Sequence, residues 1–154
     1  MRVRAPILLS ALVLLALPGR AAAQLATSVG AGVRLVFPTG DLDDIAQSGW
    51  GLAGTGEVRL LEFLAATGEV SYTHLDGEER DGGDLEDLDM LGVAVGARLY
   101  FPLWYLSAET GYFSEIDEGG FLPGAGIRIG VLDVGARYKA TGENWIELRG
   151  AVVF

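Results

Sequence analysis

The sequence predicts an all-β protein, an eight-stranded antiparallel up-and-down β-barrel that follows a signal peptide. Apolar residues alternate with small or charged residues over eight segments, and a period of two is typical of strands. Turn-forming residues separate these segments, and the connections alternate between long and short. The chain has no cysteine, so disulfides and thiolate metal sites do not stabilise it.

The first 23 residues have the composition of a secretory signal peptide. "MRVR" is basic, "APILLSALVLLALPGR" is largely apolar, and "AAA" supplies small residues before Gln24. The apolar run from Ala5 to Leu17 is shorter than the roughly 20 residues that a membrane-spanning helix needs. We therefore expect cleavage after Ala23, a signal peptide over residues 1–23 and one mature domain over residues 24–154.

The mature chain is strongly acidic. Removing Arg2, Arg4 and Arg20 from the 11 basic residues leaves 8 against 21 acidic residues, a net charge of −13. This charge argues against nucleic acid as a partner. Half of the residues are hydrophobic and the mean hydropathy is +0.34, which argues against an acidic disordered chain.

The eight segments differ between their two faces. In the fourth, Leu91, Val93 and Val95 alternate with glycine and alanine and, further along, with Arg98. We expect one face to be apolar throughout and the other to carry glycine and paired charges. The predicted strands lie near Leu25 to Phe37, Trp50 to Leu60, Glu62 to His74, Met90 to Phe101, Trp104 to Phe113, Phe121 to Gly130, Leu132 to Lys139, and Trp145 to Phe154.

An even number of strands of about ten residues, with short turns at one end and long loops at the other, is typical of transmembrane β-barrels. Lipid cannot hydrogen-bond an open strand edge, so a sheet that crosses a membrane must close. Eight strands suffice, and they leave an interior that side chains can fill. No apolar run of about 20 residues follows the signal peptide, which argues against a membrane-spanning helix.

The first connection, "FPTGDLDDIAQSGWG", resembles the junction between the first two strands of small eight-stranded outer-membrane barrels of the OmpA and OmpX type. The resemblance covers Leu25 to Phe154 and implies a bacterial outer-membrane protein without a peptidoglycan-binding domain. Its implied role is structural or in surface interaction. Its implied partners are outer-membrane lipid and lipopolysaccharide, the barrel-insertion machinery and periplasmic chaperones.

The chain ends on "LRGAVVF", which predicts a last strand that pairs with the first. By the same resemblance, Phe154 is the aromatic residue that the insertion machinery recognises. The match is partial, because Val152 stands where a second aromatic residue is often found.

The direction of the apolar face decides between a membrane barrel and a soluble, lipocalin-like ligand-binding barrel. Lys139 is the only lysine, although a soluble surface would normally carry several. Aromatic residues gather near the ends of the apolar face, where an interfacial girdle would place them. They are Phe37, Trp50, Tyr72, Phe101, Trp104, Tyr112, Phe121, Tyr138 and Phe154.

The opposite face carries arginines and carboxylates in nearly equal number, which suits a closed interior because arginine can pair bidentately with carboxylates. We expect a salt-bridged plug, with a small porin-like channel as the alternative. Glycines such as Gly124 and Gly126 would leave room for these long side chains. The predicted lumen network consists of Arg34, Glu57, Arg59, Glu69, Arg98, Glu109, Arg128, Asp133, Arg137, Glu147 and Arg149.

Acidic residues are dense in the predicted long loops. A solvated, self-repelling surface is the favoured interpretation. Divalent cation binding is the alternative, but the stretch "DGGDLEDLD" lacks the spacing of a calcium loop. These residues are Asp41, Asp43, Asp44, Asp76, Glu78, Glu79, Asp81, Asp84, Glu86, Asp87, Asp89, Glu115, Asp117 and Glu118.

His74 is the only histidine and the only candidate base for a lipid-A-modifying enzyme. Ser71 and Thr73 would point to the opposite face of its strand. Asp76, and not serine, stands two residues after it, so the His-x-Ser arrangement of lipid A deacylase barrels is missing. We expect no enzyme, no catalytic residue, no metal and no cofactor.

Overall fold

The computed structural model describes residues 26–40, 46–77, 79–80, 83–84, 87–114, 118–140, 142 and 144–154. The predicted signal peptide, residues 1–23, lies outside the described residues, as do several of the loop acids. Those acids are Asp41, Asp43, Asp44, Glu78, Asp81, Glu86, Glu115 and Asp117. In the part of the chain that is described, no helix is long and apolar enough to cross a membrane.

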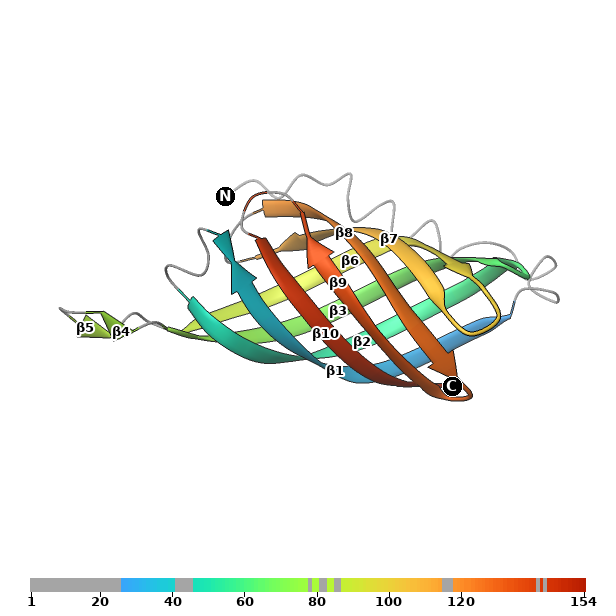
Figure 1. The fold of residues 1–154 in the computed structure, drawn as a ribbon, viewed down its shortest axis with the longest axis horizontal. Coiled ribbons are helices and arrows are strands. Elements are labelled where there is room, and N and C mark those ends of the chain that lie inside the picture. The colour runs from blue at the N-terminus through green and yellow to red at the C-terminus, as the bar shows by residue number, and fades with distance from the viewer. Residues whose placement is uncertain are drawn as a thin grey trace.

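Eight strands close into one antiparallel barrel (Figure 1). In barrel order, each strand pairs with the barrel strand that follows it in the sequence. The prediction of an all-β, eight-stranded up-and-down barrel is therefore confirmed. The strands are β1 (Thr27–Thr39), β2 (Ala46–Leu61), β3 (Leu64–Gly77), β6 (Leu88–Tyr100), β7 (Tyr105–Phe113), β8 (Glu118–Ile129), β9 (Leu132–Lys139) and β10 (Asn144–Val153).

Two short strands lie outside the barrel. β4 (Glu79–Arg80) and β5 (Gly83–Asp84) pair with each other, and Figure 1 shows them beyond one end of the barrel. They belong to the connection between β3 and β6. This short hairpin therefore lies outside the barrel wall.

The barrel closes between its first and last strands. β1 pairs with β10 from Gly30 opposite Val153 to Thr39 opposite Asn144. Beyond that register, the Phe154 amide donates to the Val29 carbonyl at 2.7 Å, and the Val29 amide donates to the Phe154 carbonyl at 3.0 Å. The barrel sheet therefore has no open edge, and every strand in it can satisfy its backbone hydrogen bonds without water, as lipid requires.

The two ends of the barrel differ in their connections. At the short-turn end, Glu62 and Phe63 join β2 to β3, residues 101–104 join β6 to β7, and Gly130 and Val131 join β8 to β9. Gly130 has a φ of 59°, a left-handed conformation that glycine adopts without steric cost. The remaining connections define the opposite, long-loop end. The predicted alternation in length is confirmed only in part: residues 40–45 and 78–87 form the two longest connections, but residues 114–117 and 140–143 are no longer than residues 101–104.

Some strands extend further than the sequence pattern indicates. β2 begins at Ala46 rather than Trp50, and β8 begins at Glu118 rather than Phe121. Both extensions lie at the long-loop end and contain polar or small residues. Backbone pairing continues there after the apolar alternation has stopped, so periodicity could not locate these strand ends.

Side chains alternate between the lumen and the exterior along each strand. In β7, Tyr105, Ser107 and Glu109 are buried, whereas Leu106 and Tyr112 are exposed. On β3 and β6 the exposed residues are again large and apolar, as Val70 and Val95 are. The apolar face therefore points outward and the charged face inward. The alternative of a soluble ligand-binding barrel, which needs the reverse orientation, is wrong.

Candidate functional site: the charged lumen

The eleven residues of the predicted lumen network come from all eight barrel strands. Their side chains share the inward-facing positions, and the structure brings all eleven into a connected set of ion pairs. The set has a central group and a second group nearer the short-turn end.

Arg137 is the hub of the central group. Its Nη2 lies 2.7 Å from both Glu69 Oε1 and Glu147 Oε1, and its Nη1 also pairs with Glu109. The Arg137 side chain is 1% exposed, and those of its three carboxylate partners are at most 7% exposed. The guanidinium thus neutralises carboxylates that water can hardly reach.

Arg34 and Arg149 complete the central group. Arg34 Nη2 donates to Glu69 Oε1 at 2.6 Å, and its Nη1 donates to Glu147 Oε2 at 3.2 Å. Arg149 Nη1 donates to Glu69 Oε2 at 3.4 Å. Three guanidinium groups therefore share three carboxylates, so the group is neutral as a whole.

The second group contains three arginines and two carboxylates. Arg128 pairs with Glu57 at 3.1 Å and with Asp133 at 2.8 Å, and Arg98 Nη1 donates to Asp133 Oδ2 at 2.9 Å. Arg59 lies at the mouth of the lumen, with its side chain 36% exposed and its Nη2 3.6 Å from Glu57 Oε1. A longer contact of 3.9 Å from Arg98 Nε to Glu109 links this group to the central one.

The network also contains two tyrosines that were not among the predicted lumen residues. Tyr105 donates its hydroxyl to Asp133 at 2.6 Å and accepts a hydrogen bond from Arg149 at 3.2 Å, so it connects the two groups. Tyr100 donates to Glu57, and the Arg59 guanidinium lies 4.3 Å from its ring centroid. Tyr100 is two residues from Arg98 and Tyr105 is four residues from Glu109, so strand alternation could have placed both tyrosines on the inner face.

Lumen glycines make space for these side chains. A Cβ built on Gly126 would lie 2.4 Å from the Tyr105 hydroxyl oxygen, and one built on Gly124 would lie 2.9 Å from Arg137 Cγ. Contacts below 3.0 Å are not tolerated without movement. Both glycines are therefore needed for the observed positions of their neighbours.

The lumen is not charged over its whole length, and the expectation that the inner face carries only glycine and paired charges is wrong at the long-loop end. A buried cluster of apolar side chains, here called the apolar plug, fills the lumen there. Lys139, which is fully buried, lies with its ammonium 4.8 Å from the Trp145 ring centroid. The plug comprises Val36, Leu75, Met90, Ala94, Phe113, Leu122 and Trp145.

Little space remains inside the barrel. Cavities of about 10 and about 20 Å³ lie beside the ion pairs, and each is of the size that holds about one water molecule. A larger, open hollow of about 570 Å³ lies at the short-turn end, where Arg59, Tyr100 and Trp104 contribute to its lining. The described interior is thus packed from the plug down to this mouth.

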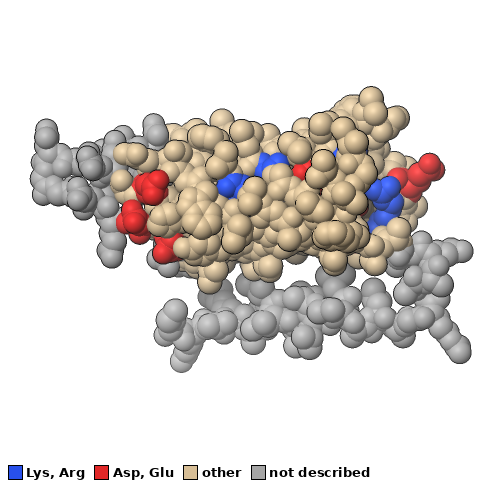
Figure 2. All heavy atoms as spheres, turned by 90° about the horizontal axis from the view of Figure 1, so that it is seen from below, with Lys and Arg blue, Asp and Glu red and all other residues tan. Residues whose placement is uncertain are grey.

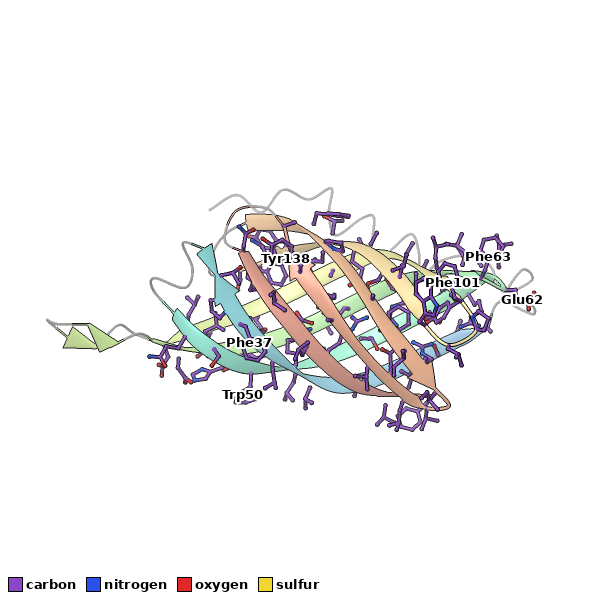
Figure 3. The ribbon with its side chains drawn as sticks, viewed as in Figure 1. Phe37, Trp50, Glu62, Phe63, Phe101 and Tyr138 are labelled. Carbon is purple, nitrogen blue, oxygen red and sulfur yellow. The ribbon has the colours of Figure 1, made fainter. Side chains whose placement is uncertain are left out.

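The exterior carries a continuous apolar belt between two groups of aromatic residues. Figure 3 shows Phe37, Trp50 and Tyr138 towards the long-loop end, and Phe63 and Phe101 at the short-turn end. All five are at least 40% exposed. On the face shown in Figure 2, charged side chains lie at the two ends, and a few more are visible within the largely uncharged surface between them. Such a belt with aromatic girdles is typical of a barrel embedded in lipid.

Of the nine aromatic residues predicted for the girdle, eight are exposed on the outer surface and Tyr72 is half-buried. Phe154 is 76% exposed beside the seam between β1 and β10. The girdle therefore matches the sequence pattern closely. Trp145 and Phe113 lie on the inner face, in the apolar plug.

No protein-family model and no curated protein sequence matches the chain. A solved structure with a similar fold is that of the Yersinia pestis outer-membrane protein Ail in a phospholipid bilayer nanodisc. It is 15% identical in sequence, with a TM-score of 0.50, and the match covers 84% of this chain and 100% of that one. The fold is that of the small outer-membrane β-barrels. Neisserial surface protein A also matches, with 17% identity, a TM-score of 0.49 and coverage of 84% of this chain and 97% of that one.

His74 lies at the long-loop end of β3. Its imidazole Nδ1 lies 2.7 Å from Asp89 Oδ1, and its Nε2 lies 3.5 Å from Asp76 Oδ1. The Tyr72 hydroxyl donates to the same Asp89 oxygen at 2.7 Å. His74 is thus separated from the lumen network and contacts carboxylates at the rim.

Proposed function

We propose that the protein is a structural or surface-interaction barrel of a bacterial outer membrane, with a lumen that does not conduct. The observation that carries this proposal is the filled interior. The apolar plug and the two groups of ion pairs follow one another along the barrel, and the cavities beside the ion pairs are of the size of a water molecule. Because paired charges and packed apolar side chains both exclude hydrated ions, the small porin-like channel is the weaker alternative.

In planar lipid bilayers, we expect the purified barrel to show no large, steady single-channel conductance. Heat-modifiable mobility of the same preparation in gels is the control, because it verifies that folded barrel is present. A steady conductance that scales with salt concentration would support the channel instead. It would show that the ion pairs line a pore and do not close it.

In this arrangement the long loops face the cell exterior and the short turns face the periplasm. The excess of acidic residues in the long loops favours a hydrated surface that repels other anions. Lipopolysaccharide around the belt, and divalent cations between its anionic groups and the loops, are the partners that suit this arrangement. Periplasmic chaperones and the insertion machinery would deliver the chain.

Deletion of Phe154 is expected to reduce the amount of folded barrel in the outer membrane several-fold. The residue contributes two backbone hydrogen bonds to the seam with Val29 and an aromatic side chain that is largely exposed. Phe154→Ala keeps the backbone bonds and removes only the side chain. The measurement is the heat-modifiable fraction of the protein in isolated outer membranes.

Phe63→Ala is the matched control, because Phe63 is also an exposed aromatic residue at the short-turn end. If Phe154→Ala assembles normally while the deletion does not, the seam bonds matter and the side chain is no assembly signal. Normal assembly of the deletion variant would contradict both roles.

A lipid-A-modifying enzyme is not favoured. The two ring nitrogens of His74 lie near the carboxylates of Asp76 and Asp89, whereas a hydrolase needs a hydroxyl nucleophile within reach of the imidazole. Mass spectrometry of lipid A from cells with the wild-type protein and with His74→Ala tests this alternative. A difference between the two would support an enzyme.

A further inference from the structure

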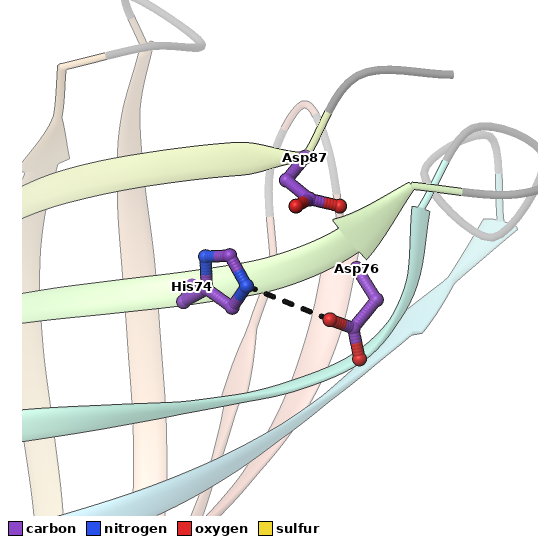
Figure 4. Close-up of side chains that lie close together, drawn as sticks. All are labelled: His74, Asp76 and Asp87. Carbon is purple, nitrogen blue, oxygen red and sulfur yellow. Dashed lines mark ion pairs between the residues drawn. The ribbon is translucent and has the colours of Figure 1, made fainter. Parts of the chain in front are cut away.

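His74, Asp76 and Asp87 form a compact group at the long-loop rim (Figure 4). His74 and Asp76 lie at the end of β3, and Asp87 directly precedes β6. One ligand atom from each residue can be chosen so that all three lie within 4.8 Å of one another. The group therefore joins the two ends of the connection that contains β4 and β5.

The imidazole is held in the orientation that metal ligation needs. Asp89 Oδ1 lies 2.7 Å from Nδ1, so the tautomer with a proton on Nδ1 donates to Asp89 and leaves the lone pair on Nε2. Nε2 faces Asp76 (Figure 4). Metal-binding histidines typically donate their other ring nitrogen to a carboxylate in this way. Asp89 is itself fixed by the Tyr72 hydroxyl.

The distances fit a small divalent ion. Two ligands of a tetrahedral zinc ion are about 3.4 Å apart when each metal–ligand bond is about 2.1 Å long, and His74 Nε2 lies 3.5 Å from Asp76 Oδ1. The Asp87 carboxylate is held near them because its Oδ1 accepts a hydrogen bond from the Gly77 amide at 3.1 Å. Only a modest movement of Asp87 would bring the third ligand to the same ion.

The donor set selects the class of metal. One imidazole nitrogen with two carboxylate oxygens suits a transition-metal ion such as Zn²⁺, whereas Ca²⁺ and Mg²⁺ prefer oxygen ligands alone. Three aspartates also surround a single histidine here, so a divalent cation would offset their mutual repulsion. We propose that His74, Asp76 and Asp87 bind Zn²⁺ or a similar divalent transition metal, with Asp89 as a positioning residue.

The test uses the untagged, refolded barrel in detergent, stripped of metal and titrated with Zn²⁺ by calorimetry. Because His74 is the only histidine, its imidazole ¹⁵N signals can be followed by NMR without assignment. We expect one equivalent of Zn²⁺ to bind and to shift the Nε2 signal. An unchanged imidazole spectrum on saturation with Zn²⁺ would overturn the proposal, and this arm needs no variant.

Variants separate ligands from general surface charge. We expect His74→Gln to weaken Zn²⁺ binding at least about tenfold, and Asp89→Asn to weaken it by about 10–100-fold, as loss of an outer-shell partner does. Asp89→Asn should also change the ratio of the two His74 tautomers, which the ¹⁵N signals report. If Asp89 had only a structural role, this ratio would stay the same. Heat-modifiable mobility verifies that each variant is folded.

Asp43→Asn and Glu62→Gln are the matched controls. Asp43 is an acidic residue of the first long connection, outside the described residues, and Glu62 is exposed at the opposite end of the barrel. We expect Zn²⁺ affinity within about fivefold of wild type in both, because isolated surface charges contribute little. If the controls weaken binding as much as His74→Gln does, general attraction to acidic loops explains it and the site is refuted.

Discussion

Replacing Arg137 with methionine is expected to lower the free energy of unfolding by about 3–5 kcal/mol. The side chain is 1% exposed and pairs with Glu69, Glu109 and Glu147. Methionine fills a similar length but leaves three buried carboxylates without their shared counter-charge. Urea titrations in phospholipid vesicles, followed by tryptophan fluorescence, would measure the change.

Arg59→Met is the matched control. Its side chain is 36% exposed, and among the described residues it has one ion pair, at 3.6 Å from Glu57, so the expected loss is at most about 1 kcal/mol. Adding Glu147→Gln to Arg137→Met should restore part of the lost stability, because without Arg137 two arginines face three carboxylates in the central group, and the second change removes the excess negative charge. Equal effects of Arg137→Met and Arg59→Met would contradict the view that burial makes the central group important.

Replacing Val95 with arginine is expected to destabilise the membrane-inserted barrel by about 2–4 kcal/mol. Val95 is 59% exposed on the outer face of β6. It lies between the level of Tyr112, which pairs with Val93, and that of Phe101 at the short-turn end. A guanidinium at this depth must be placed in hydrocarbon or must draw water into it. The equilibrium of folding into vesicles measures the cost.

Leu103→Arg provides the control for position. Leu103 is 76% exposed in the turn between β6 and β7, where an arginine can reach the headgroups, so a cost of about 0–1 kcal/mol is expected. If both substitutions cost the same, the apolar belt would not be the lipid-facing surface.

Much of the fold could be predicted from the sequence because a barrel strand repeats every two residues. Leu106 and Tyr112 had to face one side of their strand, and Glu109 the other, whatever the rest of the structure did. The same alternation placed all eleven network residues on the inner face, and the two longest connections, residues 40–45 and 78–87, marked one end of the barrel. Strand ends could not be located in this way, since β2 continues to Ala46 through residues without an apolar alternation.

The content of the lumen could be predicted only in part. Phe113 and Trp145 were identifiable as β-strand residues, but an aromatic side chain is equally acceptable in lipid and in a packed interior. Tyr100 and Tyr105 presented the same ambiguity. Their roles depend on strand stagger, which decides how far along the barrel each inward residue lies.

The sequence by itself determined the number of strands, their antiparallel order, the closure of the last strand on the first, and which residues share a face, because all of these follow from local periodicity and turn placement. The tertiary structure alone decided which inward residues meet. It places Arg137 among three carboxylates from three other strands, sets the apolar plug above them, and brings His74 to Asp87 across the longest connection. These contacts join residues on different strands, so they are set by the register and stagger of the closed sheet.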